Sequence, residues 1–226
     1  MKLYPKSLKY YFLTCDTNGL RKRHMVEEFR DYDISEINPK LGIGKNKSGA
    51  TGFSRMIDQG LRNQVRDKPF QPFVIFEDDI AKYREFPECL DIPDDTDILY
   101  IGISRCGAAK ETTWSYNLYT TPVNDDIVRI WNMLSTHGLV ICSAAGALAI
   151  QKAMMEGFFT DTIWDVFTAR IQPYYNVYAL KIPLVYQSAE FGGAERETKF
   201  ELTAYPFQDF PDSERIPITS ITTCAS

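Results

Sequence analysis

PFVIFEDDI, residues 72–80, joins a run of four apolar residues directly to three consecutive carboxylates. A short apolar run that follows turn residues predicts a buried strand over 72–76. In open α/β sheets, ligands bind beyond the carboxyl ends of the strands. The stretch therefore predicts a core strand and, at its end, a candidate site built from Glu77, Asp78 and Asp79.

Strands and helices alternate on both sides of this stretch, which predicts an α/β sandwich around a mostly parallel sheet. Asn124 is placed to cap one of the helices, with two aspartates behind it. From residue 188 the chain is polar and irregular, which predicts loops or a tail. The other predicted strands are 9–14, 33–37, 97–102, 138–142 and the extended segment 178–187, and the predicted helices are 20–30, 53–65, 124–136, 144–156 and 161–171.

Composition fits one globular domain. The 226 residues are 44% hydrophobic and 13% aromatic, which excludes a disordered chain. A net charge of −5 argues against a nucleic-acid partner, and no apolar run is long enough for a membrane span. The five cysteines form no CxxC pair, which argues against a zinc site and predicts free thiols in a reducing compartment. We therefore expect a soluble, cytoplasmic protein without a signal peptide.

The three carboxylates suit a divalent cation. Like charges close together raise one another's pKa, and bound Mn²⁺ or Mg²⁺ removes that penalty. On an extended segment Glu77 and Asp79 point the same way, so they can share one cation while Asp78 points elsewhere. The alternative is an ordinary acidic turn after a strand.

Basic residues flank two of the predicted loops. Arg21, Lys22 and Arg23 follow the first strand, while Lys45, Lys47 and Arg55 surround a glycine-rich stretch at 41–52. Cations beside glycines such as Gly49 could bind a diphosphate through side chains and backbone N–H groups. The alternative is a flexible surface loop, and the order of residues is not that of a Walker motif.

TDTIWD, residues 160–165, supplies a further pair of carboxylates. If the segment is helical, Asp161 and Asp165 lie four residues apart on one face. One of them could then act as a general base towards an acceptor hydroxyl. The alternative is a helix cap at Asp161 and a solvent-facing Asp165.

Three tryptophans and one histidine complete the candidate residues. Trp114 lies in the polar stretch ETTWSYN, so we expect it to be exposed and able to stack on a sugar. Trp131 and Trp164 lie on apolar helix faces and are expected in the core. His137 begins an apolar strand and is expected to be structural.

The order of these motifs resembles glycosyltransferase family 25, the lipooligosaccharide-type enzymes that also include collagen galactosyltransferase domains. The resemblance covers about residues 9–187. It rests on NGLRKRHM (18–25), SGATGFSRMIDQGL (48–61), VIFEDDI (74–80), DILYIG (97–102), HGLVICSAAGALAIQKAM (137–154), FFTDTIWD (158–165) and PLVYQ (183–187).

The resemblance implies a GT-A fold, a Rossmann-like sandwich forming a single domain over 1–226. About 1–110 would bind the nucleotide-sugar, about 111–187 the acceptor, and 188–226 would be a C-terminal loop or tail. It also implies a UDP-sugar donor, Mn²⁺ or Mg²⁺, and inverting transfer to a glycan hydroxyl, as in lipopolysaccharide synthesis or protein glycosylation.

The resemblance also assigns roles to single residues. Glu77 and Asp79 would hold the metal, with Glu190 or Glu195 as substitutes for a ligand that GT-A enzymes commonly take from near the C-terminus. Asp161 is the first choice for the base, and Asp165 the second. The residues expected to bind donor or acceptor are Thr14, Asp16, Arg21, Gly49, Arg55, Asp78 and Trp114.

Two other function classes remain open. A metal-dependent phosphohydrolase or nucleotidyltransferase would use the same carboxylates and release phosphate or pyrophosphate without a sugar acceptor. A non-catalytic, GT-A-like carbohydrate-binding module would bind its ligand without any dependence on metal.

Overall fold

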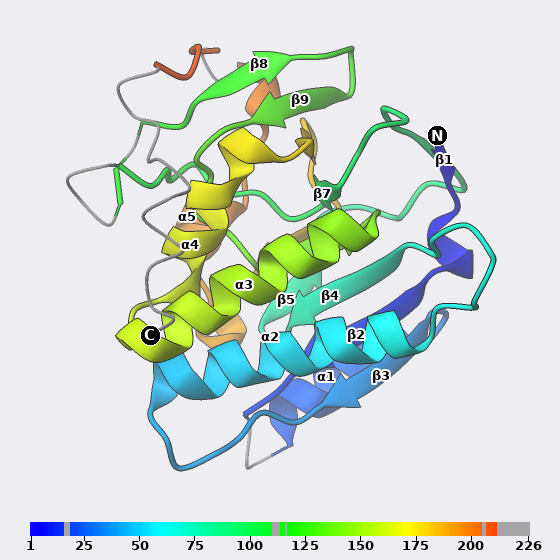
Figure 1. The fold of residues 1–226 in the computed structure, drawn as a ribbon, viewed down its shortest axis with the longest axis vertical. Helices are drawn as coiled ribbons and strands as arrows, with labels where there is room; N and C mark the ends of the chain where they lie inside the picture. The colour runs from blue at the N-terminus through cyan, green and yellow to red at the C-terminus, as the bar shows by residue number, and fades with distance from the viewer. Residues whose placement is uncertain (16–18, 110–113, 116, 205–206, 212–226) are drawn as a thin grey trace.

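An eight-stranded sheet forms the centre of the molecule (Figure 1). The computed structural model describes residues 1–15, 19–109, 114–115, 117–204 and 207–211. Across the sheet the strands are β3 (Asp33–Ile37), β2 (Lys9–Leu13), β4 (Phe73–Glu77), β10 (Gly138–Ile141), β7 (Ile98–Tyr100), β11 (Val177–Leu180), β9 (Ile127–Ile130) and β8 (Thr120–Pro122).

The sheet is mixed, so the prediction of a mostly parallel sheet is wrong, although the α/β class is confirmed. β2 runs parallel to β3 and β4, and β7 runs parallel to β11. β10 runs antiparallel to both of its neighbours, as does β9. β9 and β10 run in the same direction, and residues 131–137 connect them without a helix.

The helix predicted at 124–136 is also wrong, since the chain there forms a hairpin between β8 and β9. The Asn124 side chain accepts hydrogen bonds from the backbone N–H groups of Asp126 and Ile127, both at 2.9 Å. Asparagine makes such bonds in turns as readily as at helix caps. Ile127, Val128 and Ile130 are β-branched and favour a strand.

Helices cover both faces of the sheet. α2 (Lys45–Arg62), α3 (Ala144–Thr160) and α4 (Trp164–Ile171) pack on one face, and α1 (Leu20–Glu28) packs on the other (Figure 1). Alternate residues of β2 and β4 face the two layers. Tyr11 and Leu13 belong to the core beneath α2 and α3, while Tyr10 and Phe12 belong to the core beneath α1. Strands buried on both faces explain the continuous apolar runs of the sequence.

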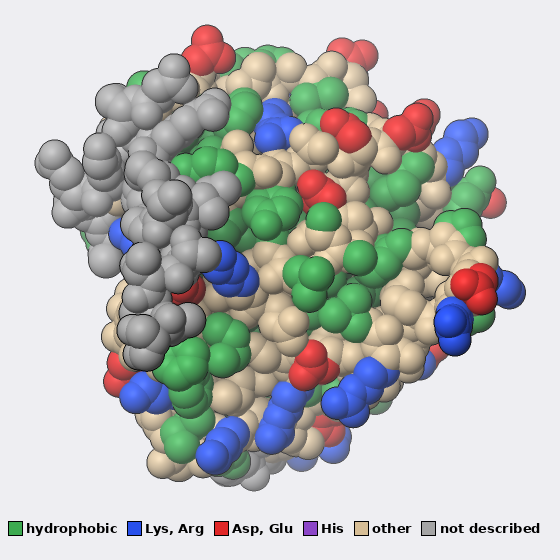
Figure 2. Space-filling view, viewed as in Figure 1, with side chains coloured by type: hydrophobic (Ala, Val, Ile, Leu, Met, Phe, Trp, Pro, Cys, Tyr) green, Lys and Arg blue, Asp and Glu red, His purple; other side chains and the backbone are tan. Residues whose placement is uncertain are grey.

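Glycines bring α2 close to its neighbours. The helix begins at Lys45, earlier than predicted, so Gly49 and Gly52 lie inside it. A Cβ atom on Gly49 would lie 2.1 Å from the Trp164 ring, and one on Gly52 would lie 2.1 Å from Leu13. In Figure 2, Lys and Arg side chains gather over α2, whose exposed residues include Lys45 and Arg55.

Smaller elements complete the fold. β5 (Ile80–Lys82) follows β4 after a two-residue turn and pairs with β12 (Val185–Gln187). No helix in the described part of the chain is both long and apolar enough to cross a membrane. The remaining elements are β1 (Lys2–Leu3), β6 (Leu90–Asp91), η1 (Pro5–Ser7), η2 (Gln172–Tyr174), η3 (Ala189–Phe191), α5 (Glu195–Thr198) and η4 (Leu202–Ala204).

Candidate functional site

Three carboxylates meet at the carboxyl end of β4. Glu77 ends the strand, Asp79 lies in the turn before β5, and Asp165 lies in the first turn of α4. The Thr136 hydroxyl joins two of them, at 2.7 Å from Glu77 Oε1 and 2.6 Å from Asp165 Oδ1. Residues from three separate parts of the chain thus build one acidic cluster.

The Gln187 side chain joins the third carboxylate to the cluster. Its Nε2 donates to Glu77 Oε2 at 2.9 Å and lies 3.4 and 3.5 Å from the two oxygens of Asp79. Glu77 and Asp79 therefore face a common point, as predicted, although Asp79 lies in a turn and not in the extended segment that the prediction assumed. Asp78 points the other way and forms an ion pair with Arg21 at 2.9 Å.

The hydrogen bonds of Thr136 favour a protonated carboxyl group in the cluster. A hydroxyl has one hydrogen to donate and two lone pairs. Trp164 Nε1–H donates to Thr136 Oγ1 at 2.9 Å, and the hydroxyl hydrogen can serve only one carboxylate. Thr136 can thus donate to one carboxylate at a time, and the second short contact is favourable when that carboxyl group is protonated.

The environment of the carboxylates favours holding that proton. Burial, followed by the charges of Asp79 and Asp165, raises the pKa of Glu77 well above its usual range. Burial also raises the pKa of Asp165 to about 6, although the Thr136 hydrogen bond opposes the shift. Burial also raises the pKa of Asp79, although the positive charge of Arg21 opposes the shift.

A second group of predicted residues meets at the ends of β2 and β4. Thr14 is buried one residue beyond β2, beside the Asp78–Arg21 pair, because Leu13 and Glu77 lie in register. Asp78 Oδ2 is buried, and among the described residues it has no hydrogen-bond partner. An unpaired buried carboxylate oxygen is costly, so this atom is a ready acceptor for a ligand hydroxyl. Asp16 lies outside the described residues.

Asp161 and Asp165 do not share a helix, so that expectation is wrong. α3 ends at Thr160, and Asp161 caps it with a left-handed backbone (φ 53°). The Asp161 side chain is 59% exposed and lies 4.0 Å from Lys47 Nζ. The β-branched residues Thr162 and Ile163 separate the two helices, and β-branched side chains are less favourable in a helix. Asp165 alone reaches the cluster.

Other predicted residues lie away from the carboxylates or have a packing role. Gly49 lies in the second turn of α2, where a regular helix uses its N–H internally, and it makes room for Trp164. Arg55 is exposed and donates to the Asn38 carbonyl oxygen at 2.6 Å. Trp114 is 54% exposed, as predicted. Trp131 follows a strand rather than lying on a helix, and it is half-buried against Phe210.

His137 and the two acidic C-terminal candidates lie outside the cluster. Burial lowers the pKa of His137 to about 3, so the prediction of a structural histidine agrees with its neutral, buried state. Glu190 is exposed in the middle of η3. Glu195 accepts from Lys199 Nζ at 2.8 Å and from the Ala189 N–H at 3.1 Å.

Thr136, Trp164 and Gln187 are the site residues that sequence reasoning missed. Trp164 was expected in the core and is 9% exposed, but its indole also orients Thr136. Thr136 ends the predicted helix 124–136, and Gln187 ends both the predicted extended segment and the PLVYQ motif, which was the one signal that pointed to it.

The described residues include no group of three His, Cys, Asp or Glu side chains arranged to hold a metal ion. Two carboxylates that face one amide N–H₂ nevertheless suit a cation chemically. Mg²⁺ in particular is commonly bound by one or two carboxylates together with water and substrate phosphates. Glu77 and Asp79 fit a cation held in that manner.

No protein-family profile matches this sequence, and no curated protein is significantly similar to it. The basis for assigning a function is therefore the acidic cluster itself and the Arg21–Asp78 pair beside it.

Proposed function

We propose that this protein is a metal-dependent glycosyltransferase that moves a sugar from a nucleotide-sugar, with a UDP-sugar favoured, to a glycan hydroxyl with inversion. The observation that carries the proposal is the common point faced by Glu77 and Asp79 at the end of β4. The order of sequence motifs supports the same assignment. Residues up to about 110 would bind the donor, and residues from about 111 to 187 the acceptor.

Glu77 and Asp79 would hold Mn²⁺ or Mg²⁺, which would supply neutralisation of charge on the leaving diphosphate. The two residues are suited to this because their carboxyl groups are buried and close together. Such a pair gains more from a cation than exposed carboxylates do, since burial penalises their charged forms.

Thr14, Arg21 and Asp78 would bind the donor nucleotide. Asp78 Oδ2 is the buried acceptor without a partner among the described residues, and a ribose hydroxyl could donate to it. Arg21 supplies positive charge beside Asp78, on the α1 side of the sheet. Asp16, Gly49 and Arg55 stay as further predicted contacts, and Trp114 as a predicted contact to the acceptor.

Asp165 is the better candidate for the general base. A base works best when its pKa lies near the working pH, and burial brings the pKa of Asp165 to about 6. Asp165 lies on the α4 side of the sheet and Arg21 on the α1 side. The base would then lie on the α4 side of the cluster, where Thr136 joins Asp165 to Glu77. Asp161, exposed at the end of α3, becomes the second choice.

Calorimetric titration of UDP and GDP, first with Mn²⁺ and then with EDTA, tests the proposal. We expect one of the diphosphates to bind only with Mn²⁺, and Asp79→Ala to lose that binding. Asp67→Ala is the matched control, because Asp67 is a carboxylate whose side chain is 91% exposed. The corresponding UDP- or GDP-sugars are then tested for transfer to glycans.

Other results would assign the cluster differently. Release of phosphate or pyrophosphate without a sugar acceptor would favour a phosphohydrolase or nucleotidyltransferase. Carbohydrate binding that EDTA does not change, with no nucleotide binding, would favour the non-catalytic module. Failure of both nucleotides to bind, with or without Mn²⁺, would contradict the glycosyltransferase proposal.

A further inference from the structure

The Gln187 carboxamide occupies the point that Glu77 and Asp79 share. Its nitrogen makes one good hydrogen bond, 2.9 Å to Glu77, and two contacts of 3.4 and 3.5 Å to Asp79. The longer contacts are near the limit for a hydrogen bond and contribute little. The amide therefore places the partial positive charge of its N–H₂ group where two buried carboxylates would otherwise repel.

Backbone hydrogen bonds fix the position of Gln187 beside Asp79, whereas rotation about the last side-chain bond can still reorient its carboxamide. β12 pairs with β5, which brings Gln187 opposite Ile80, the residue after Asp79. The Gln187 N–H donates to Thr198 Oγ1 at 3.0 Å, and the next N–H, of Ser188, donates to the Asp79 carbonyl oxygen at 2.7 Å. The carboxamide itself has an oxygen and a nitrogen of nearly equal size, so half a turn exchanges them.

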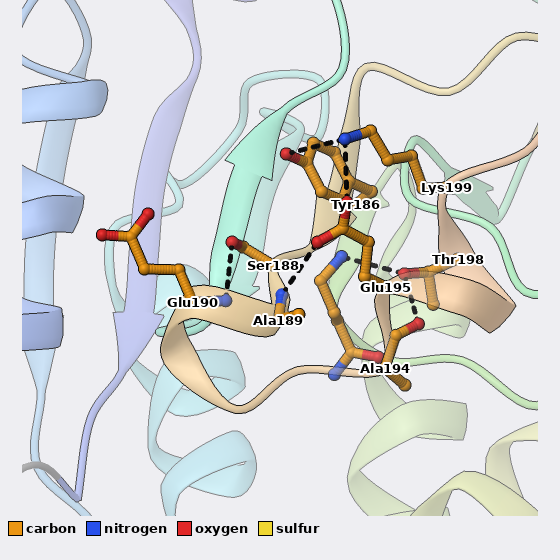
Figure 3. Close-up of polar contacts among 9 residues, drawn as sticks. Tyr186, Ser188, Ala189, Glu190, Ala194, Glu195, Thr198 and Lys199 are labelled. Carbon is orange, nitrogen blue, oxygen red and sulfur yellow. Dashed lines mark hydrogen bonds and ion pairs between the residues drawn. The ribbon is translucent and has the colours of Figure 1, made fainter.

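The segment that follows Gln187, residues 188–199, is held by hydrogen bonds among its own residues. Figure 3 shows Glu195 bound to both Ala189 and Lys199, and Thr198 bound to Ala194. The Glu190 side chain points away from these groups (Figure 3). Glu195 is therefore engaged within the segment, and Gln187 is the residue of β12 that reaches both Glu77 and Asp79.

We propose that Gln187 is a third protein ligand of the cation held by Glu77 and Asp79, with Oε1 turned to face the metal. The inference rests on the metal site of the proposed function. Hard cations accept Asn and Gln carbonyl oxygens alongside carboxylates. The two carboxylates already neutralise the charge of a dication, and a neutral third ligand adds no further negative charge. The site then keeps more attraction for a diphosphate than it would with a third carboxylate.

Two substitutions of Gln187 should act in opposite directions. Gln187→Ala removes the ligand, and we expect Mn²⁺ to bind about tenfold more weakly or worse, in line with the loss of other supporting groups at metal sites. Gln187→Glu adds a charged oxygen at the same place, so Mn²⁺ should bind more tightly. With Mn²⁺ saturating, however, UDP should bind Gln187→Glu more weakly than the unaltered chain.

The measurement is a titration of the full chain with Mn²⁺, in which the EPR signal reports the free ion. Gln151→Ala is the matched control, because Gln151 Nε2 donates to the Asp58 carboxylate at 2.6 Å between α2 and α3. We expect this variant to bind Mn²⁺ as the unaltered chain does. Circular dichroism of each variant checks that it is folded, and Gln187→Glu keeps the side-chain volume if Gln187→Ala does not fold.

The possible results separate the two proposals. Opposite shifts for Gln187→Ala and Gln187→Glu, with Gln151→Ala unchanged, support the assignment. If Mn²⁺ binds both Gln187 variants as it binds the unaltered chain while Asp79→Ala loses it, Gln187 is not a ligand and the metal site stands. If the unaltered chain binds no Mn²⁺ even with UDP present, the metal site and this inference both fail.

Discussion

The indole N–H of Trp164 donates a hydrogen bond to the Thr136 hydroxyl over 2.9 Å. This contact uses one lone pair of the hydroxyl and turns its remaining hydrogen-bonding capacity towards Glu77 and Asp165. One threonine therefore links α4 to the end of β4, and it stabilises two buried carboxyl groups at once.

Thr136→Val should remove this link and destabilise the protein. Valine has nearly the same shape but no hydroxyl, so both carboxyl groups and the indole lose their partner. We expect the free energy of unfolding to fall by about 2–4 kcal/mol, because unsatisfied buried polar groups cost about 1–3 kcal/mol each and partial rearrangement offsets some of this. Urea unfolding measures the change.

Thr121→Val is the matched control for that substitution. Thr121 Oγ1 also accepts an indole N–H, from Trp131 at 3.0 Å, but it is bonded to no carboxylate of the cluster. Its loss should cost about 1 kcal/mol, the usual contribution of one hydrogen bond. Equal losses for the two variants would mean that the carboxylates gain nothing from Thr136.

The stability of the protein should fall as the pH rises, when a chelator is present. Burial raises the pKa of Asp165 to about 6, above its value of about 3.9 in an unfolded chain. Between these two values the folded state holds more protons than the unfolded state, so the free energy of unfolding decreases with pH. The raised pKa of Glu77 extends the decrease to higher pH.

The decrease attributable to Asp165 is at most about 3 kcal/mol between about pH 4 and about pH 7. Urea unfolding at several pH values in EDTA measures it. Asp165→Asn cannot ionise at this position, so its stability should depend less on pH over the same range. A free energy of unfolding that rises through this range in the unaltered chain would contradict the raised pKa values.

Mn²⁺ should reverse this trend. A cation binds ionised carboxylates, so it competes with protons for Glu77, whose pKa is raised, and metal binding should be stronger at higher pH. We expect Mn²⁺ to raise the melting temperature more at about pH 8 than at about pH 6, because ligands of the folded state stabilise it by mass action. Calorimetry in two buffers of different ionisation enthalpy would detect the released proton. Asp79→Ala should show neither effect.

Gly49→Ala should disturb the site from a distance. The added Cβ atom would lie 2.1 Å from the Trp164 ring, so the ring or α2 must move. Overpacking of this kind costs about 1–3 kcal/mol, and displacement of Trp164 should also weaken its bond to Thr136. Gly42→Ala provides the comparison, since Gly42 has φ +80° and nothing within 4 Å of the new atom. That variant should be destabilised by backbone strain alone, about 1 kcal/mol, with the Trp164 fluorescence unchanged.

Local sequence patterns predict the parts of this fold that depend on neighbouring residues. The apolar run at 73–76 and the carboxylates behind it predict a buried strand and the common direction of Glu77 and Asp79. The hairpin at β8 and β9 was missed because Asn124 and two following aspartates suit a helix start as well as a turn. The antiparallel placement of β10 between β4 and β7 depends on pairing between distant strands, which no local pattern predicts.

The composition of the site depends on contacts between distant parts of the chain. Thr136 is 59 residues from Glu77 and Gln187 is 110 residues from it. No spacing rule connects such residues; Thr136 is brought to Glu77 by the pairing of β10 with β4, and Gln187 by the pairing of β12 with β5. The choice between Asp161 and Asp165 likewise depends on where α3 ends, which a left-handed Asp161 decides.

Asp161→Asn and Asp165→Asn test that choice directly. Both substitutions remove one carboxylate and keep the side-chain size, so each is the other's control. Asp165 is half-buried and bound to Thr136 at 2.6 Å, whereas Asp161 is mostly exposed and has a long, 4.0 Å contact to Lys47 Nζ. If Asp165 is the base, its substitution should lower the transfer rate by about 10²–10⁴-fold. UDP should still bind with Mn²⁺, because Asp165 is not a proposed metal ligand. Asp161→Asn should keep a rate close to that of the unaltered chain. The opposite result would be a large loss of rate for Asp161→Asn with Asp165→Asn still active. It would assign the role of base to Asp161 and leave Asp165 as a group that only supports Thr136 and Glu77.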